Sequence, residues 1–122
     1  YAFKDLLNTY RKVALGTDFP VEQVSPFLTF YAAVARKDLN NYPENGYQME
    51  NALSKKEALK GMTIWAAIAN FEENEKGSLE VGKAADFIIL NNDLMTTQEK
   101  NILSTKVVAT FINGENVYSL KK

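Results

Sequence analysis

The chain has 122 residues, 46% of them hydrophobic and 24% charged, which suits one folded domain and excludes a compositionally disordered chain. Its formal net charge of -1 at pH 7 excludes the strongly basic surface that is typical of nucleic-acid-binding proteins. The longest strongly apolar run, residues 64–69, is far shorter than the roughly 20 residues that span a bilayer, so neither a nucleic acid nor a membrane is expected as a partner.

The N-terminal residues predict two helices with a short strand between them. Apolar residues recur at helical spacing over residues 1–11, which predicts the end of a helix. Residues 13–15 form a short apolar run, and the glycine and proline that follow favour a strand over a buried helix. Ser25 and Pro26 predict the start of a second helix, which runs to about Arg36.

The middle of the chain predicts a long loop and a well-capped helix. Residues 38–53 are polar and rich in asparagine, and a loop of this length is usually functional or mobile, although a variable surface connection is the simpler interpretation. Ser54 and Glu57 match a capping box at the start of a helix over residues 55–70. Gly61 lies inside this helix at a cost of about 1 kcal/mol relative to alanine, which predicts the close approach of a neighbouring element.

The C-terminal residues predict a β region. Residues 87–90 are expected to form a short buried strand. Residues 107–112 and 115–118 flank Asn113 and Gly114, which is a strong signal for a two-residue hairpin turn.

Residues 77–84 match the phosphate-loop pattern G-x-x-x-x-G-K, except that Ala84 replaces the serine or threonine that would bind magnesium. A phosphate loop follows a strand and opens a helix, whereas this segment opens a predicted strand. We therefore expect a glycine turn between two short strands, with Gly82 at positive φ, and no nucleotide site. Asp86 is then a turn residue at the start of the next strand.

Residues 15–22 and 77–90, joined in this order by the capped helix, resemble the C-terminal end of a metal-dependent amidohydrolase of the amidohydrolase 3 group. The chain begins at Tyr1 without an initiator methionine, and we expect it to be the tail of a longer enzyme. The resemblance implies an α/β fold. Residues 1–75 would be the C-terminal part of a (β/α)8 TIM-barrel domain, and residues 76–122 the C-terminal strands of a small composite β-sandwich domain.

Asp18 is the candidate catalytic residue. By itself, an aspartate two residues before a proline is most simply a turn residue. Residues 16–21, however, match the family's motif at the end of the last barrel strand, so the resemblance implies that Asp18 binds metal and carries a proton from water to the leaving nitrogen. Phe19 is the candidate for lining the substrate pocket. Glu22 lies in the same loop and is a candidate to orient a substrate amine, although a surface cap is the simpler interpretation.

The resemblance also implies a divalent metal, expected to be zinc, in the full-length parent enzyme. A catalytic zinc takes about three protein ligands, and the family uses histidines from earlier strands. This chain has no histidine and no cysteine, so the remaining ligands are expected outside it. None of its lysines matches the family's metal-bridging lysine. No metal is expected to bind the fragment alone, which should be inactive.

The implied reaction of the parent is hydrolysis of a non-peptide carbon–nitrogen bond in a small amide-type molecule. Two alternatives stay open, namely deaminase or cyclic-amidase activity on the same fold, and a non-catalytic packing or interaction module. A lone barrel strand would expose both edges, so the expected partner is the missing N-terminal part of the same enzyme or a second copy of the fragment. If the true N-terminus lies upstream of Tyr1, any signal peptide would lie there too, and the localisation of this soluble-looking chain is therefore left open.

Overall fold

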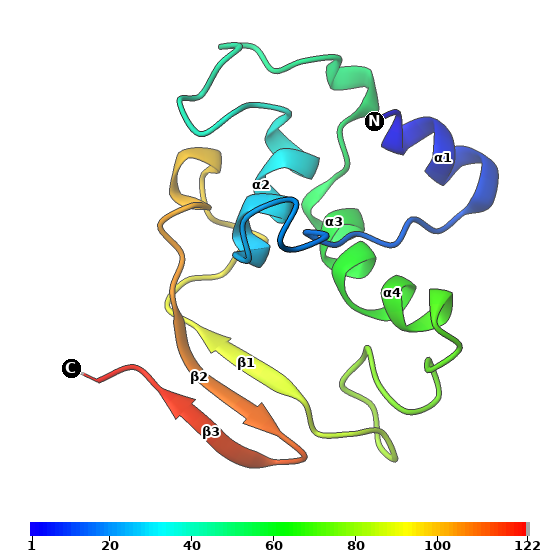
Figure 1. Cartoon of the computed structure of the whole chain (residues 1–122), viewed down its shortest axis with the longest axis vertical. Coiled ribbons are helices and arrows are strands. Elements are labelled where there is room, and N and C mark those ends of the chain that lie inside the picture. Colours follow the sequence, from blue (N-terminus) through cyan, green and yellow to red (C-terminus); the bar gives the residue numbers. More distant parts are fainter. Residues whose placement is uncertain (122) are drawn as a thin grey trace.

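The computed structural model describes residues 1–121. Figure 1 shows the helices gathered at one end of the molecule and the sheet at the other. In chain order the elements are α1 (Phe3–Tyr10), α2 (Pro26–Ala35), the 3-10 helix η1 (Met49–Asn51), α3 (Lys55–Met62), α4 (Ile64–Ala69), β1 (Phe87–Leu90), the 3-10 helix η2 (Glu99–Asn101), β2 (Val107–Ile112) and β3 (Glu115–Ser119). No helix of the described residues has the length and apolarity needed to cross a membrane.

The first two predicted helices form close to their expected positions. In α1, Leu7 is buried against the core. In α2, the side chains of Phe30 and Tyr31 are almost fully buried. Ser25 occupies the N-cap position of α2 with an extended backbone, and Pro26 follows at the first helical position, but the Ser25 side chain makes no capping hydrogen bond. The helix start is therefore set by proline and backbone geometry rather than by the serine hydroxyl.

The helix expected over residues 55–70 is interrupted, and in this respect the prediction is wrong. Thr63 has φ of -127° and ψ of -100°, which ends α3 and separates it from α4. The Thr63 hydroxyl donates to the carbonyl oxygen of Leu59 at 2.7 Å, a local bond of the kind that bends helices. The start of the helix is as predicted, because Ser54 and Glu57 form both hydrogen bonds of the capping box.

The strand expected at residues 13–15 is not formed. A strand needs a neighbouring strand to satisfy its backbone groups, and within residues 1–121 this segment pairs with none. Instead, the Leu15 amide donates to the carbonyl oxygen of Gly61 in α3 at 3.0 Å. The close approach predicted from Gly61 is confirmed, since its neighbours are Val13 and Leu15.

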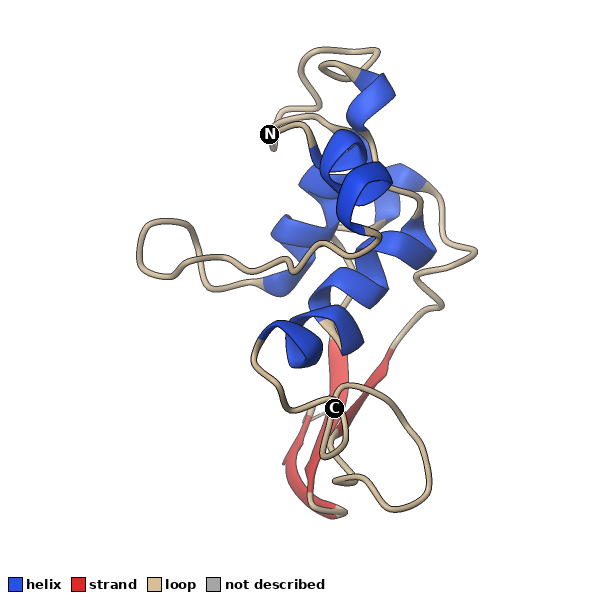
Figure 2. Ribbon diagram, turned by 90° about the vertical axis from the view of Figure 1, so that its right-hand side faces the viewer, coloured by secondary structure: helices blue, strands red, loops and turns tan. Residues whose placement is uncertain are grey.

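The three strands form one antiparallel sheet in the order β1-β2-β3. Asn113 and Gly114 connect β2 to β3 with φ values of 50° and 80°, so the predicted hairpin is confirmed, with the positive φ at both central residues that a type I′ turn requires. The expected burial of residues 87–90 is wrong for the described residues, because Ile88 and Ile89 remain 48% and 46% exposed. Within residues 1–121, no second layer of helices or strands covers the sheet there (Figure 2).

The hydrophobic core lies among the helices and includes part of the connection between β1 and β2. Leu94 and Ile102, from residues 91–106, pack with Phe30 and Tyr31 of α2. Two polar contacts hold the same connection. The Lys37 ammonium lies 2.8 Å from a Glu99 carboxylate oxygen, and the Lys55 ammonium donates to the carbonyl oxygen of Thr97. The sheet is thus attached to the helices through residues 91–106.

The second half of the long predicted loop, residues 38–53, is fastened to α2 and its C-cap by two backbone hydrogen bonds. The Tyr47 amide donates to the carbonyl oxygen of Arg36 at 2.8 Å, and the Leu53 amide donates to that of Ala33 at 2.9 Å. Within the loop, the buried Tyr31 hydroxyl donates to the Asn41 side chain at 2.8 Å. Apart from η1, the loop contains no regular secondary structure.

Candidate active-site loop

Residues 16–25 form the loop that carries Asp18, and the chain turns sharply within it. Asp18 has φ of 51°, a left-handed conformation that aspartate tolerates better than most residues. Its carbonyl oxygen accepts from the Val21 amide at 2.8 Å, and the Thr17 hydroxyl accepts from the Phe19 amide at 3.3 Å. The backbone at Asp18 therefore forms the turn that its sequence position predicts. The turn does not by itself assign a role to the Asp18 side chain.

The side chains of the three candidate residues lie at the surface of this turn. Asp18 and Glu22 are exposed, and Phe19 is 65% exposed. Among the described residues, the Asp18 carboxylate takes part in no side-chain hydrogen bond or ion pair of this chain. A carboxylate with no structural partner is available to bind a ligand, a metal or a substrate proton.

A groove with a volume of about 580 Å³ lies beside the loop, which is within the usual size of small-molecule sites. Gly16 and Glu22 line it from the loop, Thr29 lines it from α2, and Arg36 lines it from the C-cap of that helix. Asp18 and Phe19 are not among the residues that line this groove. The structure thus places Glu22 beside a groove, while the two residues expected to meet the substrate are exposed and do not line it.

The described residues contain no group of three or more histidine, cysteine, aspartate or glutamate side chains that could hold a metal ion. Asp18 fits as one oxygen ligand, because a carboxylate oxygen is an ordinary ligand of zinc. One ligand does not make a metal site, so the donors within this chain satisfy only part of the requirement.

The glycine segment before β1 behaves as a turn, as expected. Gly82 has φ of 93°, and the ammonium of Lys83 lies 2.8 Å from a Glu80 carboxylate oxygen and 2.6 Å from the Ser78 hydroxyl. The lysine that would contact a phosphate is therefore ion-paired within the turn. The expected strand before this turn is not formed. Asp86 accepts from the Asn113 amide at 2.8 Å, which confirms its place at the start of β1.

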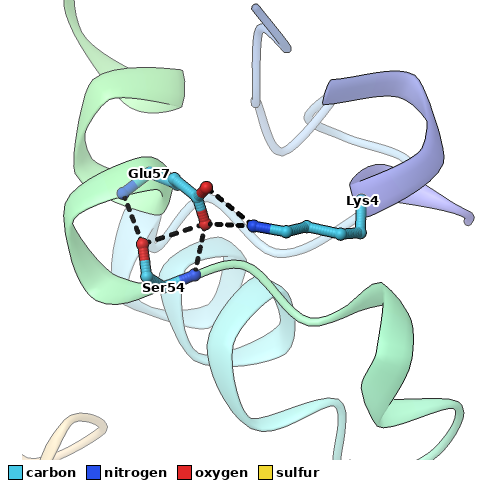
Figure 3. Close-up of polar contacts among 3 residues, drawn as sticks. All are labelled: Lys4, Ser54 and Glu57. Carbon is cyan, nitrogen blue, oxygen red and sulfur yellow. Dashed lines mark hydrogen bonds and ion pairs between the residues drawn. The ribbon is translucent and has the colours of Figure 1, made fainter. Parts of the chain in front are cut away.

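A polar cluster that the sequence did not predict joins α1 to the start of α3 (Figure 3). The Lys4 ammonium donates to both carboxylate oxygens of Glu57, at 2.7 and 3.0 Å, while the same carboxylate accepts from the Ser54 amide at 2.8 Å. The bond from Lys4 is the main cause that lowers the pKa of Glu57. Burial opposes this effect, and the bonds from Ser54 add to it. Because its carboxylate is fully engaged, Glu57 serves the fold rather than chemistry.

Comparison with known proteins identifies the family of the chain. The profile of the amidohydrolase family matches residues 1–118. The protein LONG AFTER FAR-RED 3 of Arabidopsis thaliana is 35% identical over 97% of this chain and 20% of its own length. The N-substituted formamide deformylase of Arthrobacter pascens is 28% identical, over 93% of this chain and 20% of the relative.

A third relative is the 5-methylthioadenosine/S-adenosylhomocysteine deaminase of Caldanaerobacter subterraneus, which is 33% identical over 84% of this chain and 25% of its own length. The chain thus spans between a fifth and a quarter of the length of these relatives. Since the family profile matches nearly all of its residues, the chain belongs to the amidohydrolase family.

Proposed function

We propose that this chain is the C-terminal part of a metal-dependent amidohydrolase that hydrolyses a non-peptide carbon–nitrogen bond of a small molecule. The observation that carries the proposal is the family match over residues 1–118. Two relatives add support, because a formamide deformylase and a deaminase are both named for cleavage of carbon–nitrogen bonds. The free, exposed carboxylate of Asp18 provides the chemical group that such a reaction needs.

In this proposal, residues 1–75 complete a (β/α)8 barrel and residues 76–122 complete a composite β-sandwich. Residues 13–15, which pair with no strand among residues 1–121, and the exposed apolar side chains of the sheet support it, because both leave room for neighbours that the described residues do not supply. The proposed neighbour is the N-terminal part of the same enzyme, and the alternative is a second copy of the chain. A well-folded monomer of 13.7 kDa in solution, measured by light scattering, would contradict both.

Asp18 would act at the mouth of the barrel, where the strands carry the catalytic groups of such folds. A divalent metal, proposed to be zinc, supplies Lewis acidity and lowers the pKa of water. Asp18 would donate one carboxylate oxygen to the metal, accept the proton that the attacking water loses, and return it to the leaving nitrogen. The other metal ligands would come from outside this chain. Phe19, beside Asp18 on the turn, would line the mouth of the substrate pocket.

The nearest alternative keeps the fold and changes the reaction to deamination, which the 33% identity to a deaminase favours. In that case the leaving group is ammonia rather than a substituted amine. Opening of a cyclic amide is the other variant of the same chemistry. A panel of formamides, aminopurines and cyclic imides, assayed with the full-length protein, separates the three.

The decisive test combines metal analysis with substrate assays of the full-length protein and its Asp18→Asn variant. Asparagine keeps the size of the side chain but cannot carry the proton, so we expect kcat to fall by about 100-fold to 10,000-fold. Asp5→Asn, at an exposed position of α1, is the matched control and should leave activity unchanged. Full activity of Asp18→Asn would contradict the proposed role, and the absence of hydrolysis and bound metal in the unsubstituted protein would favour a non-catalytic module.

A further inference from the structure

Gly61 lies where α3 contacts the segment that leads to Asp18. A Cβ atom placed on Gly61 would lie 2.8 Å from the Cγ atom of Leu15 and 2.9 Å from the carbonyl oxygen of Val13. Both separations are below 3.0 Å, which real Cβ atoms essentially never show. Any side chain at position 61 must therefore displace the neighbouring segment, including its backbone.

The carbonyl group of Gly61 makes a second contact with the same segment, by accepting from the Leu15 amide at 3.0 Å. In a continuous helix this carbonyl would accept from the amide of Trp65, four residues later. The helix is broken at Thr63, between these two residues. The break thus frees a helix carbonyl, and residues 13–15 use it in place of a strand partner.

The loop beyond Leu15 has few contacts of its own. A Cβ atom on Gly16 would meet no atom within 4 Å, and the turn at Asp18 is held by local hydrogen bonds at Thr17 and Val21. The far end of the loop is fixed by the start of α2. Its near end is fixed through Leu15, which precedes Asp18 by three residues.

We propose that Gly61 is a positioning residue for Asp18. This rests on the proposed function, in which Asp18 transfers a proton at the substrate. Without a side chain, Gly61 lets α3 approach residues 13–15 closely, and its carbonyl holds the Leu15 amide in register. A catalytic group displaced by about 1 Å can cost about 100-fold in rate, so a small shift of this segment has a large effect at Asp18.

The test compares Gly61→Val with Ala58→Val in the full-length protein. Ala58 is fully buried three residues earlier on the same helix, so valine there also overpacks the core, by two carbon atoms against the three added at Gly61, but leaves Gly61 itself unchanged. Hydrogen exchange is measured at the Leu15 amide relative to the amides of α2, and kcat and metal content are measured on the same samples. We expect Gly61→Val to speed relative exchange at Leu15 by about 10-fold and to lower kcat by about 10-fold to 100-fold, whereas Ala58→Val should change neither beyond its general loss of stability.

A smaller substitution keeps the test valid where valine prevents folding. Alanine at a free helical position would stabilise the helix relative to glycine, so a rise in Tm is the result expected of an unconstrained site. We expect Gly61→Ala instead to speed exchange at Leu15, and the effect should shrink in the Gly61→Ala, Leu15→Ala double variant because the Cγ atom is gone. Unchanged exchange at Leu15 in both Gly61 variants would overturn the proposal.

The exchange measurement separates this inference from the proposed function. A full-length protein that hydrolyses no amide-type substrate would contradict the proposed function and, with it, the role of Gly61 at Asp18. Hydrogen exchange at the Leu15 amide would still show whether Gly61 fixes residues 13–15. If kcat falls no further in Gly61→Val than in Ala58→Val, the positioning role is wrong even where the hydrolase assignment holds.

Discussion

Two short apolar segments, residues 13–15 and Phe87–Leu90, satisfy their backbones in different ways. The second is β1 and pairs along its length with β2, which follows it in the same chain. The first lies against a helix and donates a hydrogen bond from Leu15 to Gly61. Similar side chains thus lead to different structures, because the availability of a partner strand decides whether an apolar segment becomes a strand.

The two segments also differ in what fixes them to the core. β1 is held through the connection that follows it, where Ile102 is fully buried, while residues 13–15 contact α3 directly through Gly61. The sheet therefore depends on contacts outside its own faces. Substitutions at the anchoring points should therefore have larger effects than substitutions in the strands.

The largest effect is expected from Ile102→Ala. Removing a fully buried isoleucine leaves a cavity and should lower the free energy of unfolding by about 2–5 kcal/mol. The matched control is Ile88→Ala in β1, where the side chain is 48% exposed and the expected loss is about 0.5–1 kcal/mol. Urea unfolding followed by circular dichroism measures both. Equal losses would show that the connection does not anchor the sheet.

A smaller effect is expected from Gly114→Ala in the hairpin turn. Gly114 has φ of 80°, and alanine in the left-handed region costs about 1–2 kcal/mol, which should weaken the pairing of β2 with β3. Gly16→Ala is the matched control, because a Cβ atom there meets no neighbour within 4 Å. Thermal unfolding compares the two variants. A larger loss of Tm in Gly16→Ala would contradict the difference drawn between the hairpin and the loop.

Ser54→Ala tests the start of α3, and therefore the helix that holds residues 13–15. Loss of the N-cap hydroxyl should cost about 1 kcal/mol. Ser25→Ala at the start of α2 is the matched control, since the Ser25 side chain makes no capping hydrogen bond and its loss should cost clearly less. Chemical unfolding midpoints of the two variants provide the measurement, and equal shifts would count against the capping box as a source of stability.

The smallest effect concerns the pH dependence of the contact between Lys4 and Glu57. The pKa of Glu57 is lowered in the folded state, chiefly by the bond from Lys4, so this contact stabilises the fold above the unfolded pKa of about 4.3 and is lost as the pH falls through the folded pKa. The side chains are 33% and 26% exposed, and solvent screening limits the contribution to about 0.5–1 kcal/mol.

The measurement compares unfolding free energies of the unsubstituted protein and Glu57→Gln between about pH 7 and about pH 3. The difference between them should shrink as the pH falls. Glu50→Gln, at an exposed position of η1, serves as the control. A difference that is constant or that grows toward low pH would contradict the assigned role of the ion pair.

The features that the sequence predicted correctly are encoded by neighbouring residues. Ser54 and Glu57 are three positions apart, and Asn113 and Gly114 are adjacent, so one short window contains the whole signal. The close packing at Gly61 was also predictable, because a glycine within a helix is costly unless something approaches it. The partner of Gly61 was not, because no pattern connects it to Leu15.

The features that the sequence did not predict depend on residues far apart in the chain. Lys4 and Glu57 are 53 positions apart, and Ile102 belongs to a mostly polar connection whose few apolar residues show no helical or strand periodicity. The candidate site has the same limitation. The backbone turn at Asp18 follows from local chemistry, but its catalytic role is implied by the resemblance and not by the geometry of this chain, in which the carboxylate lies in solvent.

The burial of Leu94 and Ile102 among the helices has a consequence for anyone who wishes to exchange parts of this protein. Residues 76–122 cannot be exchanged as an independent unit. Removing them would also remove Leu94 and Ile102 from the core and leave cavities among the helices. A graft from a relative would have to bring matching residues for α2 as well. Chimaeras that keep Leu94 and Ile102 together with their α2 partners should fold, and chimaeras that separate them should be unstable and prone to aggregate.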